Sequence, residues 1–238
     1  MRLTEFSLDQ AVQFHDELNP NLWEGDHLQA DVRAKLLQIA EDFKEFIGIT
    51  NYDLMDITIS GSNAAYTYTP KSDIDLHLVV MIPEEHDPEL RQLFDAKKYQ
   101  YNDQYDFKIH GYDVEVYVQD ATQPHHSMGI YSVQNDRWLK QPQPIRATVD
   151  DSAVEHKYRG YKERIKRAIN SDNEPMCHKL WHSIKDMRTS GLARGGEFGV
   201  ENITFKMLRA EGDLKDLKDH MTALKVHNMS LGEQDDQV

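Results

Sequence analysis

Apolar residues recur at helical spacing in two stretches near the start of the chain and in four near its end. The first two predicted helices cover residues 8–18 and 26–47, and Gly48 suits the C-terminal stop of the second. Near the end of the chain, the predicted helices cover residues 150–170, 174–190, 200–211 and 213–226.

Between these regions, short apolar segments rich in β-branched residues indicate strands. A further helix is predicted over residues 88–99, and Pro142 and Pro144 mark a linker. The predicted strands are residues 55–60, 73–81, 105–110, 112–119 and 128–133. The pattern therefore predicts two domains, a domain of strands and helices over residues 1–145 and an all-helical domain over residues 146–238.

Composition narrows the class of protein. The chain has 238 residues, of which 39% are hydrophobic, and it has a single cysteine, Cys177, so no disulfide can form within it. No run approaches the 18 or so apolar residues that a membrane span needs, and the first residues have no apolar core typical of an export signal. We expect a cytoplasmic protein with no membrane segment.

The net charge of −14 is unevenly distributed. Residues 1–154 carry −15, whereas residues 155–194 carry +5. A polyanion should therefore prefer the second of these segments. Within it, Arg159, Lys162 and Lys166 share a side at helical spacing. This row is either an ordinary solvated face or a surface that follows the phosphates of an acceptor strand.

The most informative stretch joins a glycine–serine turn to a strand with two aspartates. One predicted strand ends in Gly61-Ser62, and after a short spacer the next begins Ser72-Asp73-Ile-Asp75. Side chains alternate along a strand, so the two aspartates share one face while apolar residues point the other way. Two carboxylates this close repel each other, and a bound cation removes that cost. Hard oxygen ligands suit Mg²⁺ or Mn²⁺.

A third carboxylate lies on the strand predicted over residues 112–119. Three valines at alternate positions form its buried face, and Asp113, Glu115 and Tyr117 form the opposite one. Glu115 is centred between the valines, so we favour it over Asp113 as the third ligand. His77 shares the face of the two aspartates, and we expect it to be packed or hydrogen-bonded.

A Gly-Ser turn, a spacer, a Ser-Asp-x-Asp strand and a later acidic strand together resemble the DNA polymerase beta-like nucleotidyltransferase superfamily. The resemblance covers residues 55–120, and the stretch from Met187 to Arg209 is similar to small phage and bacterial members. It implies an α+β fold, in which a mixed β-sheet nucleotidyltransferase domain flanked by helices precedes an all-helical C-terminal domain. The third acid of this superfamily is often Asp, and here it is Glu.

The resemblance also implies a reaction and its residues. A nucleoside monophosphate would pass from a nucleoside triphosphate to a hydroxyl group, with two Mg²⁺ or Mn²⁺ ions stabilising the attacking and leaving oxygens. Asp73 and Asp75 would bridge both ions, and Glu115 would hold the ion beside the acceptor. The residues assigned to the nucleotide are Gly61, Ser62, Ser72, Lys185 and Lys206, of which the two lysines are candidates for the β- and γ-phosphates.

Two further expectations concern the triphosphate and the acceptor. Residues 63–66 should begin a helix whose N-terminus faces the triphosphate. The acceptor is an RNA 3′ end, a protein side chain or a small molecule. The alternatives are a non-catalytic nucleotide-binding or partner-binding module, against which three intact acids speak, and a synthase of nucleotide second messengers, for which the chain is short.

Overall fold

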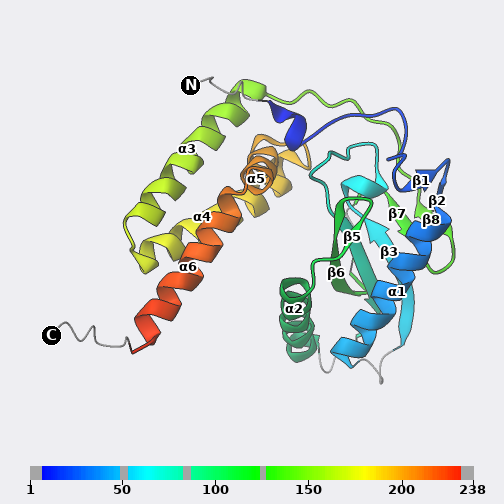
Figure 1. The fold of residues 1–238 in the computed structure, drawn as a ribbon. Helices are drawn as coiled ribbons and strands as arrows, with labels where there is room; N and C mark the ends of the chain where they lie inside the picture. Colours follow the sequence, from blue (N-terminus) through cyan, green and yellow to red (C-terminus); the bar gives the residue numbers. More distant parts are fainter. Residues whose placement is uncertain (1–6, 49–52, 83–86, 124–126, 232–238) are drawn as a thin grey trace. The chain divides into compact units, whose positions relative to one another are not determined.

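The structure is a computed structural model, which describes residues 7–48, 53–82, 87–123 and 127–231. The chain divides into two compact units, which are Val12–Arg146 and the combination of Met1–Ala11 with Ala147–Val238. The first contains a mixed six-stranded sheet with flanking helices, and the second is helical (Figure 1). The predicted α+β fold class is confirmed.

The sheet has the strand order β5–β6–β4–β3–β7–β8. Strands β4 and β6 run parallel, and the other neighbouring pairs are antiparallel. The strands are β3 (Leu54–Ser60), β4 (Ile74–Val80), β5 (Lys108–Ile109), β6 (Tyr112–Asp120), β7 (Ile130–Ser132) and β8 (Arg137–Lys140). The three long central strands β3, β4 and β6 agree with the predicted ones, whereas β8 was not predicted.

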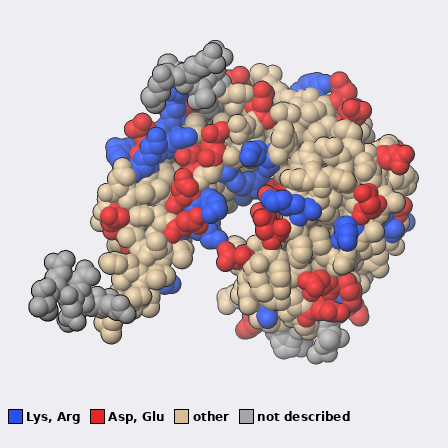
Figure 2. All heavy atoms as spheres, in the orientation of Figure 1, with Lys and Arg blue, Asp and Glu red and all other residues tan. Residues whose placement is uncertain are grey.

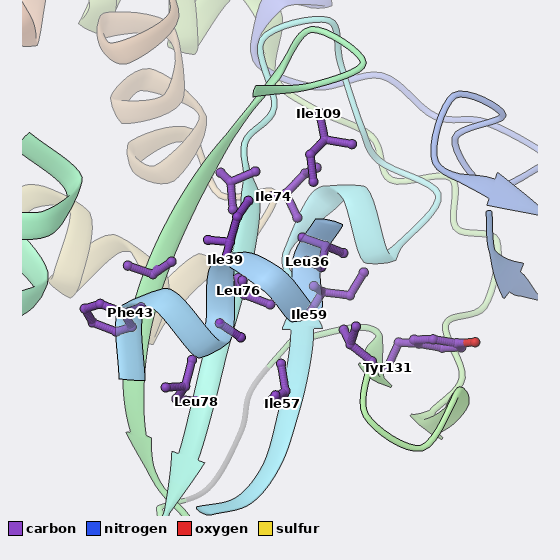
Figure 3. Close-up of a cluster of buried hydrophobic side chains, with 14 of the residues drawn as sticks. Leu36, Ile39, Phe43, Ile57, Ile59, Ile74, Leu76, Leu78, Ile109 and Tyr131 are labelled. Carbon is purple, nitrogen blue, oxygen red and sulfur yellow. The ribbon is translucent and has the colours of Figure 1, made fainter. Parts of the chain in front are cut away.

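Helix α1 (Ala30–Ile47) covers one face of the central strands. Its side of the core is apolar because alternate residues of β3 and β4 point toward it, and Figure 3 shows these side chains meeting those of the helix. The fully or almost fully buried members include Leu36, Phe43, Ile59, Ile74, Leu76 and Leu78. Gly48 ends α1 in the left-handed conformation, with φ 69° and ψ 31°, as the sequence predicted. The opposite face of β4 and β6 carries mostly polar side chains, which include Asp75, His77, Glu115 and Tyr117.

Helix α2 (Asp87–Gln104) packs along β6 beyond the point where the short strand β5 ends. There the Asn102 side chain takes the place of a neighbouring strand. Its Nδ2 donates to the Val116 carbonyl (3.1 Å), and its Oδ1 accepts from the Val116 N–H (3.0 Å). Both edge groups of this residue are therefore satisfied without a further strand. The strand predicted over residues 105–110 is wrong for its first half, because β5 is only Lys108–Ile109 and the Tyr105 N–H still donates to the Tyr101 carbonyl of α2.

The helix predicted over residues 8–18 is also wrong. Only the three-residue 3₁₀ helix η1 (Leu8–Gln10) forms there. Beyond it, the His15 N–H donates to the Tyr66 carbonyl (2.9 Å), and the His15 ring stacks on Tyr68 at 3.8 Å. These long-range contacts replace the hydrogen bonds that a helix would have made within the segment.

The second predicted helix begins later than expected, at Ala30 instead of residue 26. Before it, β1 (Trp23–Glu24) and β2 (His27–Leu28) form a small antiparallel pair. The turn between them contains Gly25 with a φ of 59°. The Trp23 ring stacks on the Trp138 ring at 4.8 Å. Aromatic packing against β8 holds the hairpin in place. The apolar spacing that predicted a helix from residue 26 contains no information on this contact.

The helical unit contains α3 (Asp151–Asn170), α4 (Glu174–Gly195), α5 (Val200–Ala210) and α6 (Asp213–Met229). These agree with the predicted helices, except that α4 continues to Gly195. Asp150 and Asn173 cap α3 and α4 by accepting from the backbone N–H groups of Ala153 and Met176. The core of the unit includes Val154, Ile165, Leu180, Ile184, Ile203 and Leu208. Among the helices described, none has the length and apolar character to cross a membrane.

Candidate active site

Strand pairing brings the predicted acidic residues together. Strands β4 and β6 run parallel with Asp75 opposite Glu115, and Asp73 comes directly before β4. Ile74 and Leu76, on either side of Asp75, are fully buried in the core, so Asp75 points to the opposite face. Val114 and Val116 are buried on either side of Glu115 in the same way. Burial of the apolar positions therefore fixes the direction in which both acids point.

The carboxylates of Asp73, Asp75 and Glu115 form one cluster. Each residue is half-buried, and each offers an oxygen that lies within 4.8 Å of those of the other two. Two oxygens bound to the same Mg²⁺ lie at most about 4.2 Å apart, because each Mg–O distance is about 2.1 Å. Small side-chain movements would therefore close the cluster on an ion. The donor set consists of hard oxygens, so the residues fit the divalent cation that the sequence predicted.

Gly61, directly after β3, allows the turn at the end of this strand to lie against Asp75. Its φ of 78° and ψ of −163° fall in a region of backbone conformation that is almost restricted to glycine. A Cβ added to Gly61 would lie 2.0 Å from Asp75 Oδ2. The absence of a side chain at Gly61 is thus a condition for the position of the central acid.

Ser62 and Ser72 are hydrogen-bonded to each other across the turn. The Ser62 hydroxyl donates to Ser72 Oγ (2.8 Å), which also accepts from the Thr69 N–H (2.9 Å). The helix expected from residue 63 is wrong, because Ser62–Ala64 forms only the 3₁₀ helix η2 and Ala65 is extended. Binding of an anion by a helix N-terminus therefore has no basis at this turn.

Asn63 ties the turn to the rest of the sheet unit. The residue is 1% exposed. Its Nδ2 donates to the Asp73 carbonyl (2.9 Å), and its Oδ1 accepts from Asn19 Nδ2 (2.9 Å). Its own carbonyl accepts from Trp23 Nε1 (2.8 Å). The sequence pattern predicted Asn63 only as the start of a helix, because its partners Asn19 and Trp23 are distant along the chain.

We expect Asn63→Ala to lower the free energy of unfolding by about 2–4 kcal/mol, because it leaves a buried partner, the Asn19 amide, and a partly buried one, the Asp73 carbonyl, unsatisfied, and an unsatisfied buried group costs about 1–3 kcal/mol. Chemical denaturation would measure the change. Asn21→Ala is the matched control, since Asn21 is exposed and such a substitution should stay within about 0.5 kcal/mol. Equal stability of the two variants would contradict a structural role for the Asn63 amide.

Tyr117 and His77 lie on the same face as the acids. The Tyr117 hydroxyl donates to Glu115 Oε2, and its ring stacks on the His77 ring with centres 5.1 Å apart. His77 Nε2 is 3.1 Å from Ser60 Oγ. Burial raises the pKa of Tyr117, and the negative charges of Asp75 and Glu115 raise it further. Tyr117 is therefore a neutral hydrogen-bond donor to the acidic cluster. The expectation that His77 is packed and hydrogen-bonded is confirmed.

Lys185 and Lys206 lie in the helical unit, on α4 and α5. The Lys185 ammonium lies 5.1 Å from the centre of the Trp181 ring, and Lys206 Nζ is 3.6 Å from Glu197 Oε1. Burial lowers the pKa of Lys206 below its ordinary value, and the nearby charge of Glu197 offsets only part of this lowering. The assignment of the two lysines to the triphosphate stays a prediction.

The basic row predicted on one side of α3 is not a continuous free surface. Lys162 donates to the Tyr158 hydroxyl oxygen (2.6 Å), and its ammonium lies 3.6 Å from Asp213 on α6. Arg159 is paired with Glu155 one turn earlier (2.6 Å). Figure 2 shows basic and acidic side chains mixed in the region of α3. Lys162 therefore stabilises the contact between α3 and α6, which weakens the case for a phosphate-following surface.

A groove of about 750 Å³ lies on the α1 side of the sheet unit. Its walls come from α1 and from the segment around β5, and include Asp31, Gln38, Asp42, Tyr105, Phe107 and His110. None of the site residues predicted from the sequence lines it. Among the described residues, the acidic, histidine and cysteine side chains close enough together to hold a metal ion are Asp73, Asp75 and Glu115, which lie outside this groove.

Comparisons with known proteins add little to this geometry. No family model matches the sequence, and no curated protein matches it. Among solved structures, the chain is similar to the STING-associated CdnE c-di-GMP synthase from Capnocytophaga granulosa, with 13% sequence identity, 84% of each chain covered and a TM-score of 0.23. A similarity of this size carries no argument about function, so the assignment depends on the residues of the chain itself.

Proposed function

We propose that the chain is a metal-dependent nucleotidyltransferase, which transfers a nucleoside monophosphate from a nucleoside triphosphate to an acceptor hydroxyl and releases pyrophosphate. The observation that carries the proposal is the convergence of Asp73, Asp75 and Glu115, with oxygens within 4.8 Å of one another, beside a turn that only glycine permits at residue 61. A binding module that holds no metal would have no need of three carboxylates held this close together against their mutual repulsion.

The three acids would hold Mg²⁺ or Mn²⁺. When bound, the metal supplies positive charge that stabilises the attacking and leaving oxygens. In the reaction, a bond forms between the acceptor oxygen and the α-phosphorus, and the bond from that phosphorus to the bridging oxygen of pyrophosphate breaks. Glu115 would help to accept the proton of the acceptor hydroxyl. Because Tyr117 donates to Oε2 of Glu115, the orientation of that carboxylate is already restricted.

The triphosphate would lie along the Gly61–Ser62 turn. The Ser62 N–H and hydroxyl could donate to phosphate oxygens, and Gly61, whose side-chain space is taken by the Asp75 carboxylate, keeps this turn beside the acidic cluster. The Ser62 hydroxyl would then exchange its Ser72 partner for a phosphate oxygen. Lys185 and Lys206 remain the proposed contacts for the β- and γ-phosphates. An RNA 3′ end, a protein side chain and a small molecule remain candidate acceptors.

We expect the reaction to require a divalent cation. The test is incubation of the protein with nucleoside triphosphates labelled at the α-phosphate, in Mg²⁺, in Mn²⁺ and in excess chelator, with release of pyrophosphate as a second measurement. Turnover should stop in chelator and return when the cation is restored. Full turnover in excess chelator would refute the proposal.

The same incubation separates the proposal from its alternatives. Transfer of label to an added RNA, protein or small-molecule acceptor is the expected outcome. Nucleotide binding without pyrophosphate release in the presence of any acceptor would favour a non-catalytic module. Linked nucleotides formed from triphosphates alone would identify a second-messenger synthase.

A further inference from the structure

Behind the acidic cluster, side chains from three adjacent strands form a connected row on the site face of the sheet. Ser60 comes from β3, His77 from β4, and Glu115 and Tyr117 from β6. The register places His77 directly opposite Tyr117. This pair lies two residues further along the strands than the pair of Asp75 and Glu115, and on the same face. The row therefore begins at a predicted metal ligand and runs away from it across the sheet.

The contacts within the row restrict the Tyr117 ring from several sides. His77 stacks on it, with ring centres 5.1 Å apart and planes inclined by 20°. His77 is itself held by Ser60, which is 4% exposed, through the 3.1 Å contact between Ser60 Oγ and His77 Nε2. On α2, the Lys98 ammonium lies 4.9 Å from the centre of the Tyr117 ring. Tyr117 is thus a rigid donor, and Glu115 Oε2 receives its hydrogen bond.

Glu115 needs such a donor more than the two aspartates do. Its side chain has one more rotatable bond than that of Asp73 or Asp75, so more conformations must be excluded before its oxygens occupy one position. The carboxylate groups that bind metals are generally oriented by hydrogen bonds from neighbouring residues, and loss of such a partner typically weakens metal binding by 10–100-fold.

We infer that Tyr117 is a positioning residue, which holds the Glu115 carboxylate in its metal-binding orientation, and that His77 and Ser60 fix Tyr117 for this purpose. The inference rests on the proposed function only in so far as Glu115 is a metal ligand. It adds a residue that acts through Glu115, since no contact between Tyr117 and the substrate is required.

The test is the affinity for Mn²⁺ alone, measured by electron paramagnetic resonance in the absence of nucleotide. Tyr117→Phe should weaken Mn²⁺ binding by about tenfold or more. Tyr131→Phe is the matched control, because the Tyr131 hydroxyl also donates to a carboxylate, that of Asp136 (2.6 Å), on the same unit but outside the acidic cluster. The control should bind Mn²⁺ as the wild type does.

A double-substitution experiment shows whether Tyr117 acts through Glu115. In a Glu115→Gln background, Tyr117→Phe should cause no further loss of Mn²⁺ affinity. Equal Mn²⁺ affinity of the wild type and Tyr117→Phe would overturn the inference, and so would a loss of equal size in both backgrounds. A wild-type protein that binds no Mn²⁺ and turns over no nucleotide would instead refute the proposed function.

Discussion

Asp75→Asn is expected to lower nucleotidyl transfer by at least about a thousandfold while leaving the fold intact. Asp75 is the central member of the cluster, paired across the sheet with Glu115 on one side and Ser60 on the other. The substitution keeps the shape of the side chain and removes the charge that would hold the cation. A bound cation is worth several kcal/mol of stabilisation in the transition state, and about 4 kcal/mol corresponds to a thousandfold change in rate.

The stability of this variant distinguishes a catalytic from a structural role. Removing one of three crowded negative charges relieves repulsion in the metal-free protein. In chelator, the melting temperature should therefore equal that of the wild type or exceed it slightly. Asp113→Asn is the matched control, because Asp113 lies on the same face of β6 but is exposed and paired with Lys108, and this variant should keep its activity. A large fall in the melting temperature of Asp75→Asn would mean that Asp75 holds the fold together.

Gly61→Ala is expected to lower transfer by about a hundredfold or more and to destabilise the protein as well. The new methyl group would lie 2.0 Å from Asp75 Oδ2, so either the turn or the carboxylate must move. Displacement of catalytic groups by about 1 Å can cost a hundredfold in rate. The backbone conformation of Gly61 adds strain of about 1–3 kcal/mol for any other residue.

Gly48→Ala separates the clash from the strain. Gly48 also has a positive φ, 69°, but an added Cβ would meet nothing within 4 Å. This control should lose about 1–2 kcal/mol of stability and keep its affinity for Mn²⁺ and its rate of transfer. Activity measured alongside chemical denaturation would compare the two variants. Full activity of Gly61→Ala would contradict the proposed arrangement of the turn and Asp75.

The central strands and the acidic cluster could be predicted because one physical rule governs both. Side chains alternate along a strand, so the buried residues that define β4 and β6 also define the face on which Asp75 and Glu115 lie. Alternation places Asp113 and Glu115 on the same face, and Glu115 was preferred because it is centred between the valines, whereas Asp113, next to the first residue of β6, is exposed. The local sequence pattern was therefore enough to predict that these acids lie together.

The surroundings of the site depend on contacts that no local pattern reports. Asn63 is held by Asn19, 44 residues earlier, and His15 is held by the backbone of Tyr68, 53 residues later. The segment around His15 has helical periodicity, yet the His15 N–H bonds to the Tyr66 carbonyl instead of to a carbonyl one helical turn earlier. Alternation placed Tyr117 on the correct face, but only the parallel register of β4 with β6 brings it against His77.

The side chain of Asn102 also affects whether another protein molecule can pair with the edge of β6. An exposed strand edge is a template on which another chain can pair, and proteins protect such edges by covering or interrupting them. At Val116 one amide group occupies both backbone positions that an incoming strand would use. Replacement of Asn102 by an apolar residue of similar size would leave both backbone groups of Val116 without this partner, and any local opening of α2 would then expose an unpaired rung of β6. Its cost would fall on solubility at high protein concentration, where edge-to-edge association leads to aggregation.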